Sequence, residues 1–294
     1  MSDGLVVVDK PGGMTSHDVV ARVRRLAGTR RVGHGGTLDP MATGVLVVGV
    51  GRGTRLLTYV VGTGKSYQAT IRLGESTVTD DAEGEVTGGA SADHLSDAQV
   101  REALAGFTGD IEQVPSAVSA IKIDGRRAYR RVRSGEEVAL APRKVHISRL
   151  AVTGLRRVPG GRIDVDVDLS CSSGTYVRAI ARDLGARLGV GGHLTALRRT
   201  AVGGFTLVEA LGLDALAERA PDVVAIPLAA AADRLFVRRD VPAEQARVLS
   251  HGGRLPPIGM AGPYAVFGPD GSLVAVVVER DGAARPEVVF AGAG

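Results

Sequence analysis

One aspartate of this chain lies on a glycine-rich segment where its carboxylate could take part in catalysis. Asp39 lies in the run from Gly33 to Gly44, which contains four glycines and is followed by a stretch of apolar residues. Glycines let the main chain approach a ligand closely and adopt positive φ angles, and Pro40 biases Asp39 toward an extended conformation. A carboxylate held in this way can act on a ligand. The same composition suits a plain loop with a helix-capping Asp equally well.

Motifs for metal or cofactor binding are missing from the sequence. Cys171 is the single cysteine, so it cannot form an internal disulfide, and no Cys/His cluster has metal-ligand spacing. The glycines from Gly49 to Gly53 have the wrong spacing for a dinucleotide fingerprint, and Gly64-Lys65-Ser66 lacks the first glycine of a phosphate-binding loop. We therefore expect no metal and no cofactor.

Charge is unevenly distributed along the chain, whose formal net charge is +4. Residues 121–149 contain nine Lys or Arg against three acids, whereas residues 75–112 contain ten acids against one Arg. One part of the surface could therefore face the phosphates of a polyanion while another could not. Two solvated faces of opposite sign remain an equally open interpretation.

The N-terminus does not have the pattern of a targeting segment. An acid, Asp3, stands where a signal peptide has basic residues, and the apolar run that follows is four residues long. No stretch reaches the roughly 18 apolar residues that a membrane span needs. We expect a cytoplasmic protein with no membrane association.

The elements that must position Asp39 follow from hydrophobic periodicity. Leu5–Val8 and Val45–Val50 are continuous apolar runs, which favour buried strands on either side of the loop. Between them, Ser16 can cap a helix that ends at Gly28. Further along, the alternation in Tyr67–Leu73 and in Ile163–Leu169 predicts half-buried strands.

The second half of the chain indicates two helical regions and a small β-rich end. Ser96 with Gln99 forms a capping-box pattern, and a helix is expected from Val177, with Arg178 off its apolar stripe. After about residue 233 the pattern changes to short strands around a turn at Pro269-Asp270-Gly271. We expect a domain over residues 1–232 and a C-terminal domain over residues 233–294.

The glycine-rich run resembles the motif G-H-x-G-x-L-D-P-x-A-x-G of the TruB family of tRNA pseudouridine synthases. Further matches follow in the family's order over roughly the first 210 residues: Val8 to Ser16, Lys65-Ser66-Tyr67, Val114 to Tyr129, Cys171 to Gly185, and Leu197-Arg198-Arg199. One departure is Gly35, where many relatives carry Thr. The resemblance implies an α+β fold with a mixed, mostly antiparallel sheet flanked by helices and loops, and a PUA-like C-terminal domain.

The resemblance also assigns roles to single residues. Asp39 would be the catalytic carboxylate that cleaves and re-forms the glycosidic bond, and Arg178 would pair with it. The target base must be flipped out of the RNA to be reached, and Tyr67 would stack on it. The other residues that the resemblance places near the target nucleotide are His34, which fills the space that the base leaves, Tyr176, Lys10 with Pro11 as a buttress, and Leu197, which lines the uracil pocket or is simply core.

The expected substrate is uridine 55 in the TΨC loop of tRNA. The basic insertion at about 121–149 would grip phosphates through Lys122, Arg126, Arg127 and Arg130, with contacts that weaken in salt. We expect a monomer that needs no obligatory protein partner. Two alternatives stay open: a tRNA-folding or RNA-binding factor independent of catalysis, and the catalytic subunit of a guide-RNA particle, which the short N-terminus and the lack of Lys-rich tails disfavour.

Overall fold

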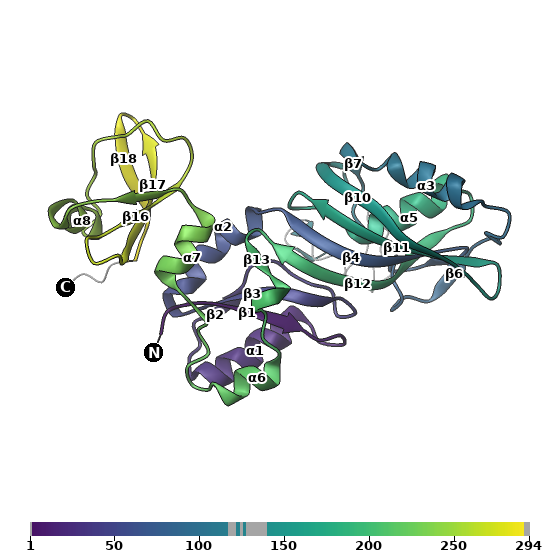
Figure 1. Ribbon diagram of the computed structural model, residues 1–294, viewed down its shortest axis with the longest axis horizontal. Coiled ribbons are helices and arrows are strands. Elements are labelled where there is room, and N and C mark those ends of the chain that lie inside the picture. Colours follow the sequence, from purple (N-terminus) through teal and green to yellow (C-terminus); the bar gives the residue numbers. More distant parts are fainter. Residues whose placement is uncertain (1, 117–121, 124–125, 128–139, 291–294) are drawn as a thin grey trace. The chain divides into compact units, whose positions relative to one another are not determined.

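The computed structural model describes residues 2–116, 122–123, 126–127 and 140–290. The chain forms two compact units, which are described separately (Figure 1). Unit 1 comprises Met1–Asp39, Val45–Gly62 and Val202–Gly294, and unit 2 comprises Pro40–Gly44 and Thr63–Ala201. The expected domain boundary at residue 232 stays a prediction. No helix of the described residues is long and apolar enough to cross a membrane.

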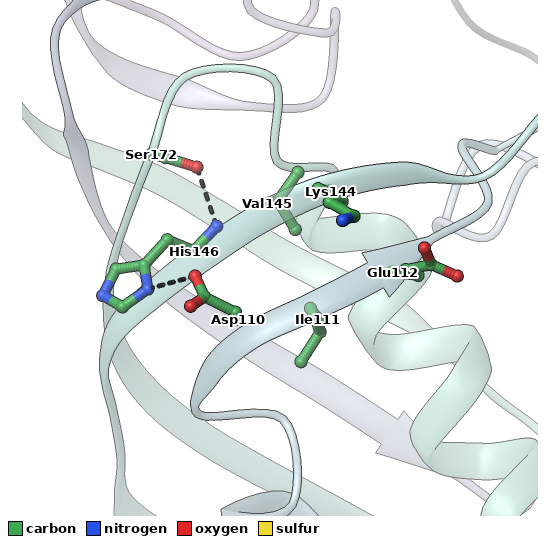
Figure 2. A pocket seen from close by; sticks show the side chains of 7 residues that line it. All are labelled: Asp110, Ile111, Glu112, Lys144, Val145, His146 and Ser172. Carbon is green, nitrogen blue, oxygen red and sulfur yellow. Dashed lines mark hydrogen bonds and ion pairs between the residues drawn. The ribbon is translucent and has the colours of Figure 1, made fainter.

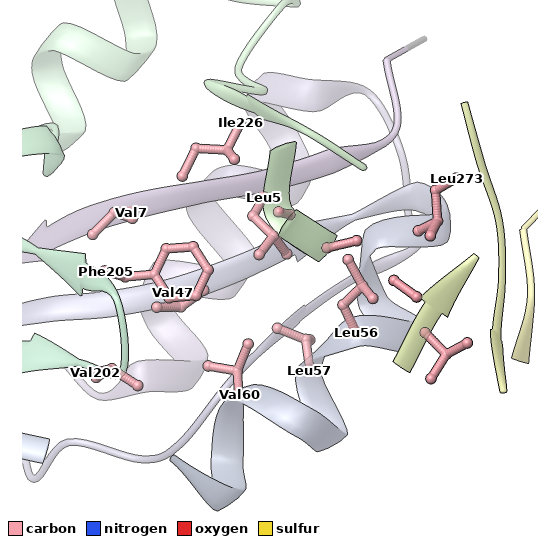
Figure 3. Close-up of a cluster of buried hydrophobic side chains, with 14 of the residues drawn as sticks. Leu5, Val7, Val47, Leu56, Leu57, Val60, Val202, Phe205, Ile226 and Leu273 are labelled. Carbon is pink, nitrogen blue, oxygen red and sulfur yellow. The ribbon is translucent and has the colours of Figure 1, made fainter. Parts of the chain in front are cut away.

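Unit 1 is built around two strands that are buried on both faces. The sheet contains β1 (Gly4–Lys10) and β3 (Thr43–Val50), with β14 (Ile226–Pro227) beside β1 and β2 (Val32–His34) beside β3. In β1, Leu5 and Val7 pack into one apolar cluster (Figure 3). Val6 and Val8 pack into another cluster on the opposite face. This explains the continuous apolar run, because a strand covered on both sides has no polar face.

Helices cover both faces of the unit 1 sheet. On one face lie α1 (Ser16–Ala27) and α6 (Leu213–Glu218), and on the other lie α2 (Leu57–Gly62) and α7 (Leu228–Leu235). Short segments connect these elements: η1 (Gly51–Leu56), β13 (Phe205–Thr206) and η2 (Leu207–Glu209).

Helix α1 begins differently from the sequence expectation. The N-cap is Thr15, whose hydroxyl accepts from the Asp18 N–H while the Asp18 carboxylate accepts from the Thr15 N–H. Ser16, expected as the cap, is instead the first helical residue and is buried. The spacing explains the difference, since Thr15 has an acid three residues later and Ser16 has Val19 there. The end at Gly28, with a φ of 62°, is confirmed.

The C-terminal part of unit 1 is a four-stranded sheet. Its order is β15 (Arg238–Asp240), β16 (Tyr264–Phe267), β17 (Leu273–Arg280) and β18 (Ala283–Val289), with α8 (Ala243–Ser250) alongside. Its last strand is anchored to η1, where Arg55 donates to the Val289 carbonyl over 2.7 Å and Arg52 donates to the Phe290 carbonyl. Arg52 also forms an ion pair with Asp3 at 2.5 Å.

Unit 2 contains a mostly antiparallel sheet. From the first residues of β3 its order is β12 (Gly192–Val202), β4 (Lys65–Leu73), β11 (Arg162–Cys171), β10 (Arg143–Val158) and β7 (Gly109–Gln113). β4, β11, β10 and β7 pair antiparallel, whereas β12 pairs with β3 in parallel. Two short hairpins accompany the sheet, β5 (Ser76–Thr77) with β6 (Val86–Gly88) and β8 (Lys122–Ile123) with β9 (Arg126–Arg127).

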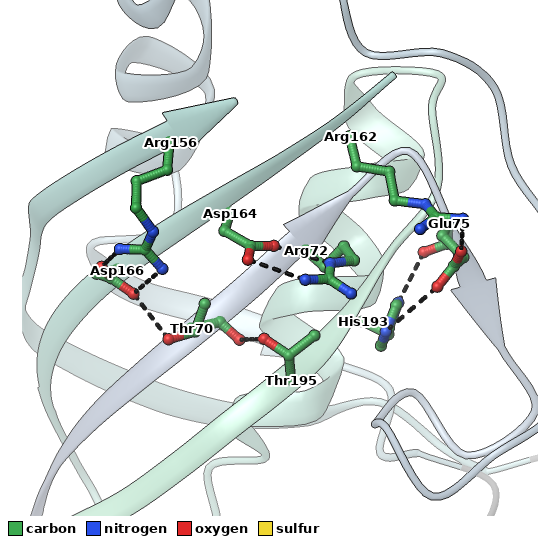
Figure 4. A network of polar contacts seen from close by, with 9 residues as sticks. All are labelled: Thr70, Arg72, Glu75, Arg156, Arg162, Asp164, Asp166, His193 and Thr195. Atoms are coloured by element: carbon green, nitrogen blue, oxygen red, sulfur yellow. Dashed lines mark hydrogen bonds and ion pairs between the residues drawn. The ribbon is translucent and has the colours of Figure 1, made fainter. Parts of the chain in front are cut away.

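The two faces of the unit 2 sheet differ in polarity. Helices α3 (Asp97–Ala105) and α5 (Val177–Arg187) lie along the sheet, and Ile163, Val165, Val167 and Leu169 of β11 are buried. The intervening acids form a polar network (Figure 4). In it, Arg72 binds Asp164 at 2.8 Å, and Asp166 accepts from Thr70 at 2.7 Å and pairs with Arg156. The alternation in this strand therefore predicts the structure correctly, and the mixed α+β fold is confirmed.

Candidate active site

The loop that carries Asp39 is fixed by a buried serine. The Ser16 hydroxyl donates to the Leu38 carbonyl over 3.1 Å and accepts from the Leu38 N–H over 2.9 Å. Ser16 is 1% exposed and Leu38 is 4% exposed. Both polar groups of the residue before Asp39 are thus satisfied inside the fold, as buried main-chain groups must be. The carboxylate of Asp39 follows at a partly exposed position.

Glycine is required where this loop enters strand β3. Gly44 has a φ of 97°, a conformation that other residues rarely adopt. A Cβ atom at this position would lie 2.2 Å from the carbonyl oxygen of Arg199, to which Gly44 is opposed in the parallel β3–β12 pair. The final glycine of the run therefore permits two backbones to approach within unit 2.

Arg178, expected to be functional, is buried at the start of helix α5. Its guanidinium donates to the Thr79 carbonyl over 2.8 Å and lies 3.5 Å from the Asp81 carboxylate. The side chains of Arg178 and Asp81 are 6% and 4% exposed. A buried guanidinium needs such a counter-charge, because desolvating an unpaired ion is costly. Asp39 and Arg178 belong to different units, so their pairing stays a prediction.

Asp80, next to Asp81, occupies a strained position. Its φ is 59°, and its carboxylate lies 3.4 Å from Arg182 of α5. Burial raises the pKa of Asp80, and the Ser116 hydroxyl and the charges of Arg182 and Arg178 oppose that rise. The acid-rich stretch 75–112 is therefore more than a solvated face. It supplies buried carboxylates to the arginines of α5.

Tyr176 is the N-cap residue of α5, two residues before Arg178. Its side chain makes no capping hydrogen bond to the helix. The main chain is held instead by Gln113, the last residue of β7, whose amide bonds to both the N–H and the carbonyl of Tyr176. Gln113 is 2% exposed. No sequence pattern had marked this glutamine.

Tyr67, the expected stacking residue, lies on β4 opposite Leu169 and is 8% exposed. Lys65 lies two residues earlier, and its ammonium donates to the Thr63 carbonyl over 2.8 Å. Burial lowers the pKa of Lys65 to about 8, with a further lowering from the charge of Arg199. The K-x-Y motif thus brings a titratable amine close to the expected aromatic platform.

Leu197 lies on β12 and lines a pocket of about 580 Å³. Its lining mixes polar residues, among them Thr43, Gln68 and Asp168, with apolar ones such as Met41 and Val167. Leu197 is 8% exposed, which suits both roles considered for it, core residue and pocket wall. Its contact with a uracil stays a prediction.

Two residues of unit 1 complete the expected set. Lys10 is fully buried, and its ammonium donates to the carbonyls of Pro11 at 2.9 Å and Met14 at 2.6 Å. These contacts hold the turn before α1, and the role of Lys10 as a buttress of the site stays a prediction. His34 lies on β2, and its ring packs edge-on against His17 with a centroid distance of 5.4 Å.

The basic insertion lies largely outside the described residues. Arg130 falls outside them, and Lys122, Arg126 and Arg127 are described only as members of the short strands β8 and β9. Their expected phosphate contacts stay a prediction.

A second pocket, of about 410 Å³, lies along the edge strand β7 (Figure 2). Its walls include an exposed pair in which His146 Nδ1 lies 2.8 Å from Asp110, and the Ser172 hydroxyl accepts from the His146 N–H. None of the residues that line it was assigned a role, although Lys144 and His146 lie within the insertion at about 121–149. Because the His146–Asp110 pair is mostly solvated, it is a weak candidate for catalysis.

Comparison with known proteins defines the class of this fold. Among solved structures, the "Crystal Structure of a Cbf5-Nop10-Gar1 Complex" aligns with a TM-score of 0.73 at 24% identity, over 98% of this chain and 85% of that chain. A structure of an H/ACA RNP bound to a substrate RNA containing 2′-deoxyuridine aligns with a TM-score of 0.71 at 23% identity, over 98% and 85%. These likenesses show that this chain shares its fold with the matched chains of those two structures.

Sequence comparison identifies the family. Residues 24–177 match the TruB family pseudouridylate synthase (N terminal domain), residues 178–222 the tRNA pseudouridylate synthase B C-terminal domain, and residues 236–291 the tRNA Pseudouridine synthase II, C terminal. A protein of Thermobifida fusca named tRNA pseudouridine synthase B is 57% identical over 99% of this chain and 100% of its own length. One of the same name from Arthrobacter is 56% identical, over 99% and 97%. The chain belongs to the TruB family and is a pseudouridine synthase.

Proposed function

We propose that this enzyme converts uridine 55 in the TΨC loop of tRNA to pseudouridine, with Asp39 as the catalytic carboxylate. The observation that carries the substrate class is the full-length likeness to proteins named tRNA pseudouridine synthase B. The position within the tRNA and the role of Asp39 rest on the resemblance of the run Gly33 to Gly44 to the family's catalytic motif.

Pseudouridine formation requires few chemical groups from the protein. The bond from N1 of the uracil to the ribose is broken, the base turns, and a bond from C5 to the same ribose carbon forms. The proton on C5 leaves and N1 gains one, so the reaction is an isomerisation without a donated group. An ionised carboxylate in a fixed place is the key requirement, and the Ser16–Leu38 contacts supply the fixed place for Asp39.

Three further residues are proposed to act on the same nucleotide. Arg178 pairs with the carboxylate of Asp39 and orients it, since a guanidinium can bind a carboxylate through two parallel hydrogen bonds. Tyr67 stacks on the flipped uracil. Tyr176, held by Gln113, contacts the target nucleotide.

Binding of the RNA is proposed to rest on the basic insertion and to need no protein partner. Lys122, Arg126, Arg127 and Arg130 contact phosphates, which positions the RNA without reading its sequence. The C-terminal sheet resembles a PUA-like module, but its charge is balanced, with seven Arg against seven acids from residue 233 onward. It is proposed to contribute less to RNA binding than the insertion does.

The decisive experiment is the Asp39→Asn variant with purified tRNA and no other protein. We expect pseudouridine formation to fall by about 10³-fold or more, because a carboxamide can neither ionise nor accept a proton. tRNA binding should persist. Asp270→Asn is the matched control, because Asn keeps the acceptor oxygen that receives the Ser272 N–H in an exposed turn.

Substantial residual activity of Asp39→Asn would overturn the catalytic assignment. If the variant instead loses activity but keeps full biological function, the RNA-folding alternative gains support. That alternative also predicts that charge reversal at Arg126, Arg127 and Arg130 abolishes biological function. Wild-type enzyme that modifies tRNA only with added proteins would contradict the proposal of independent action.

A further inference from the structure

A buried glutamine of unit 2 makes an unusual pair of contacts with the main chain. The Oε1 atom of Gln113 accepts from the Tyr176 N–H over 2.7 Å, and Nε2 donates to the Tyr176 carbonyl over 3.0 Å. The orientation of the amide follows from these partners, because a reversed amide would place donor against donor and acceptor against acceptor. One planar group therefore fixes both polar atoms of a single residue 63 positions later in the chain.

The residue that Gln113 holds determines where helix α5 begins. The Tyr176 carbonyl also accepts from the N–H groups of Ala179 and Ile180, over 3.1 and 3.3 Å, so it belongs to the first turn of the helix. Arg178 lies in that same turn. A displacement of the Tyr176 peptide would therefore move both the Tyr176 ring and the Arg178 guanidinium.

The chain that leaves β7 strengthens this connection. Directly after Gln113, the Val114 carbonyl accepts from Arg182 of α5 over 2.8 Å. Arg182 also forms an ion pair with Asp80 at 3.4 Å. Gln113 and Val114 are thus two consecutive attachments between the end of β7 and helix α5, which carries Arg178.

We infer that Gln113 is a positioning residue for pseudouridine formation, whose amide sets the direction in which Tyr176 and Arg178 face the target nucleotide. This inference rests on the proposed function, which gives Tyr176 and Arg178 their roles. Gln113 itself touches no reacting atom. Its contribution is to place the groups that do, and a misplacement of about 1 Å can lower a rate by roughly a hundredfold.

The Gln113→Glu variant separates positioning from simple stabilisation. When ionised, the Glu side chain can accept from the Tyr176 N–H but presents a second oxygen to the Tyr176 carbonyl. When protonated, it is an isostere of Gln that both accepts and donates. Burial and the facing carbonyl both favour the protonated form, so its pKa should lie above that of an ordinary Glu.

The charged groups around position 113 have opposing effects on the ionisation of a Glu side chain placed there. Arg182 and Arg178 of α5 favour an ionised Glu, whereas Asp80 and Asp81 oppose it. Asp110 and Glu112 of β7 add two further acids. The ionisation of the new Glu should therefore be followed through the ratio of the variant rate to the wild-type rate at each pH. In this ratio, the effects of groups that titrate in both proteins cancel.

The expected result is a pH-dependent defect. At pH 8 the kcat of Gln113→Glu should be lower than that of the wild type by roughly tenfold to a hundredfold, with little change in KM for tRNA. The ratio should recover toward one as the pH falls. Gln113→Met, which loses both hydrogen bonds, should have a similar defect that does not depend on pH. Thermal unfolding at each pH identifies loss of folded enzyme.

Gln99→Glu is the matched control. Gln99 uses only its Oε1 atom, which accepts from the N–H and the hydroxyl of Ser96 in a capping box, and Glu can replace it there. The control should retain wild-type rates at every pH. A flat ratio for folded Gln113→Glu, or wild-type kcat for folded Gln113→Met, would overturn the inference. Asp39→Asn tests the proposed function separately, because it should be inactive at every pH.

Discussion

Two buried side chains, one in each unit, each form hydrogen bonds with both the N–H and the carbonyl of one distant residue. The side chain is a hydroxyl in unit 1 and an amide in unit 2. In unit 1 the single oxygen of Ser16 both donates to and accepts from Leu38. In unit 2 the amide of Gln113 divides these contacts between two atoms that bond to Tyr176. Leu38 directly precedes Asp39, and Tyr176 precedes Arg178 by two residues. Both contacts therefore act on a residue just before one with a proposed role.

The difference lies in what surrounds each contact. Ser16 and Leu38 are both buried, and Ser16 begins helix α1, whose Val19 and Val20 pack into an apolar cluster. Gln113 lies beside a group of buried charges that includes Arg178, Asp80 and Asp81. A hydroxyl does not titrate near neutral pH, whereas buried carboxylates and guanidiniums depend on one another's charge. We therefore expect the unit 2 contact to be more sensitive to single substitutions and to pH.

The largest loss of stability should follow from removing the negative charge of Asp81, the buried partner of Arg178 in unit 2. Asp81→Asn leaves the guanidinium of Arg178 with less negative charge in a dry environment, and should lower the free energy of unfolding by about 3 kcal/mol. Urea denaturation measures this value. Asp281→Asn, which removes an exposed carboxylate paired with Arg285, is the control and should cost less than about 1 kcal/mol. Equal effects would show that the Arg178–Asp81 pair is not special.

The two main-chain contacts can be compared directly by removing each. Ser16→Ala removes both hydrogen bonds to the Leu38 main chain, and Gln113→Met removes the bond to the Tyr176 N–H and one of the bonds to its carbonyl. Each variant should lower the free energy of unfolding by about 2 kcal/mol. Ser148→Ala, which removes an exposed hydroxyl that donates to the Ser170 carbonyl, should change it by less than about 0.5 kcal/mol. If only one of the two variants is destabilised, the contacts are not equivalent.

The smallest effect is expected at Asp80. Asn adopts a φ near 59° readily, and it has no charge to bury. Because burial raises the pKa of Asp80, the folded protein binds its proton more tightly than the unfolded chain does. The ionised form is therefore unfavourable above that pKa, and the cost disappears as the pH falls through it.

Asp80→Asn should consequently match the wild type at pH 7 within about 1 kcal/mol, or exceed it in stability. Any advantage should shrink on acidification, which a series of thermal denaturations from pH 7 to pH 4 would measure. An Asn variant that loses stability more at pH 7 than at pH 4 would contradict the sign of this shift.

The sequence predicted the elements well because their signals are local. The continuous apolar run of β1 and the alternation of β11 each depend on neighbouring residues, and the capping box at Ser96 depends on three positions. The error at α1 was also local, since Thr15, and not Ser16, has the partner three residues ahead. The motif resemblance marked Asp39 and Arg178 and placed the chain in its family.

The supporting contacts were not predictable from the sequence. Gln113 meets Tyr176 across 63 residues, and Ser16 meets Leu38 across 22 residues, distances at which no periodicity operates. Asp81 looked like one acid among many in the stretch 75–112, and only its burial distinguishes it. Arg178 was expected off the apolar stripe of its helix, yet it is buried, because acids from another segment accompany it.

Arg52 connects two segments of unit 1 that are far apart in the sequence. One guanidinium binds Asp3, directly before β1, and the carbonyl of Phe290, directly after β18. A single side chain therefore connects the segment before β1 to the segment after β18. Loss of the Asp3 carboxylate would therefore release Arg52 and weaken its hold on the segment that follows β18.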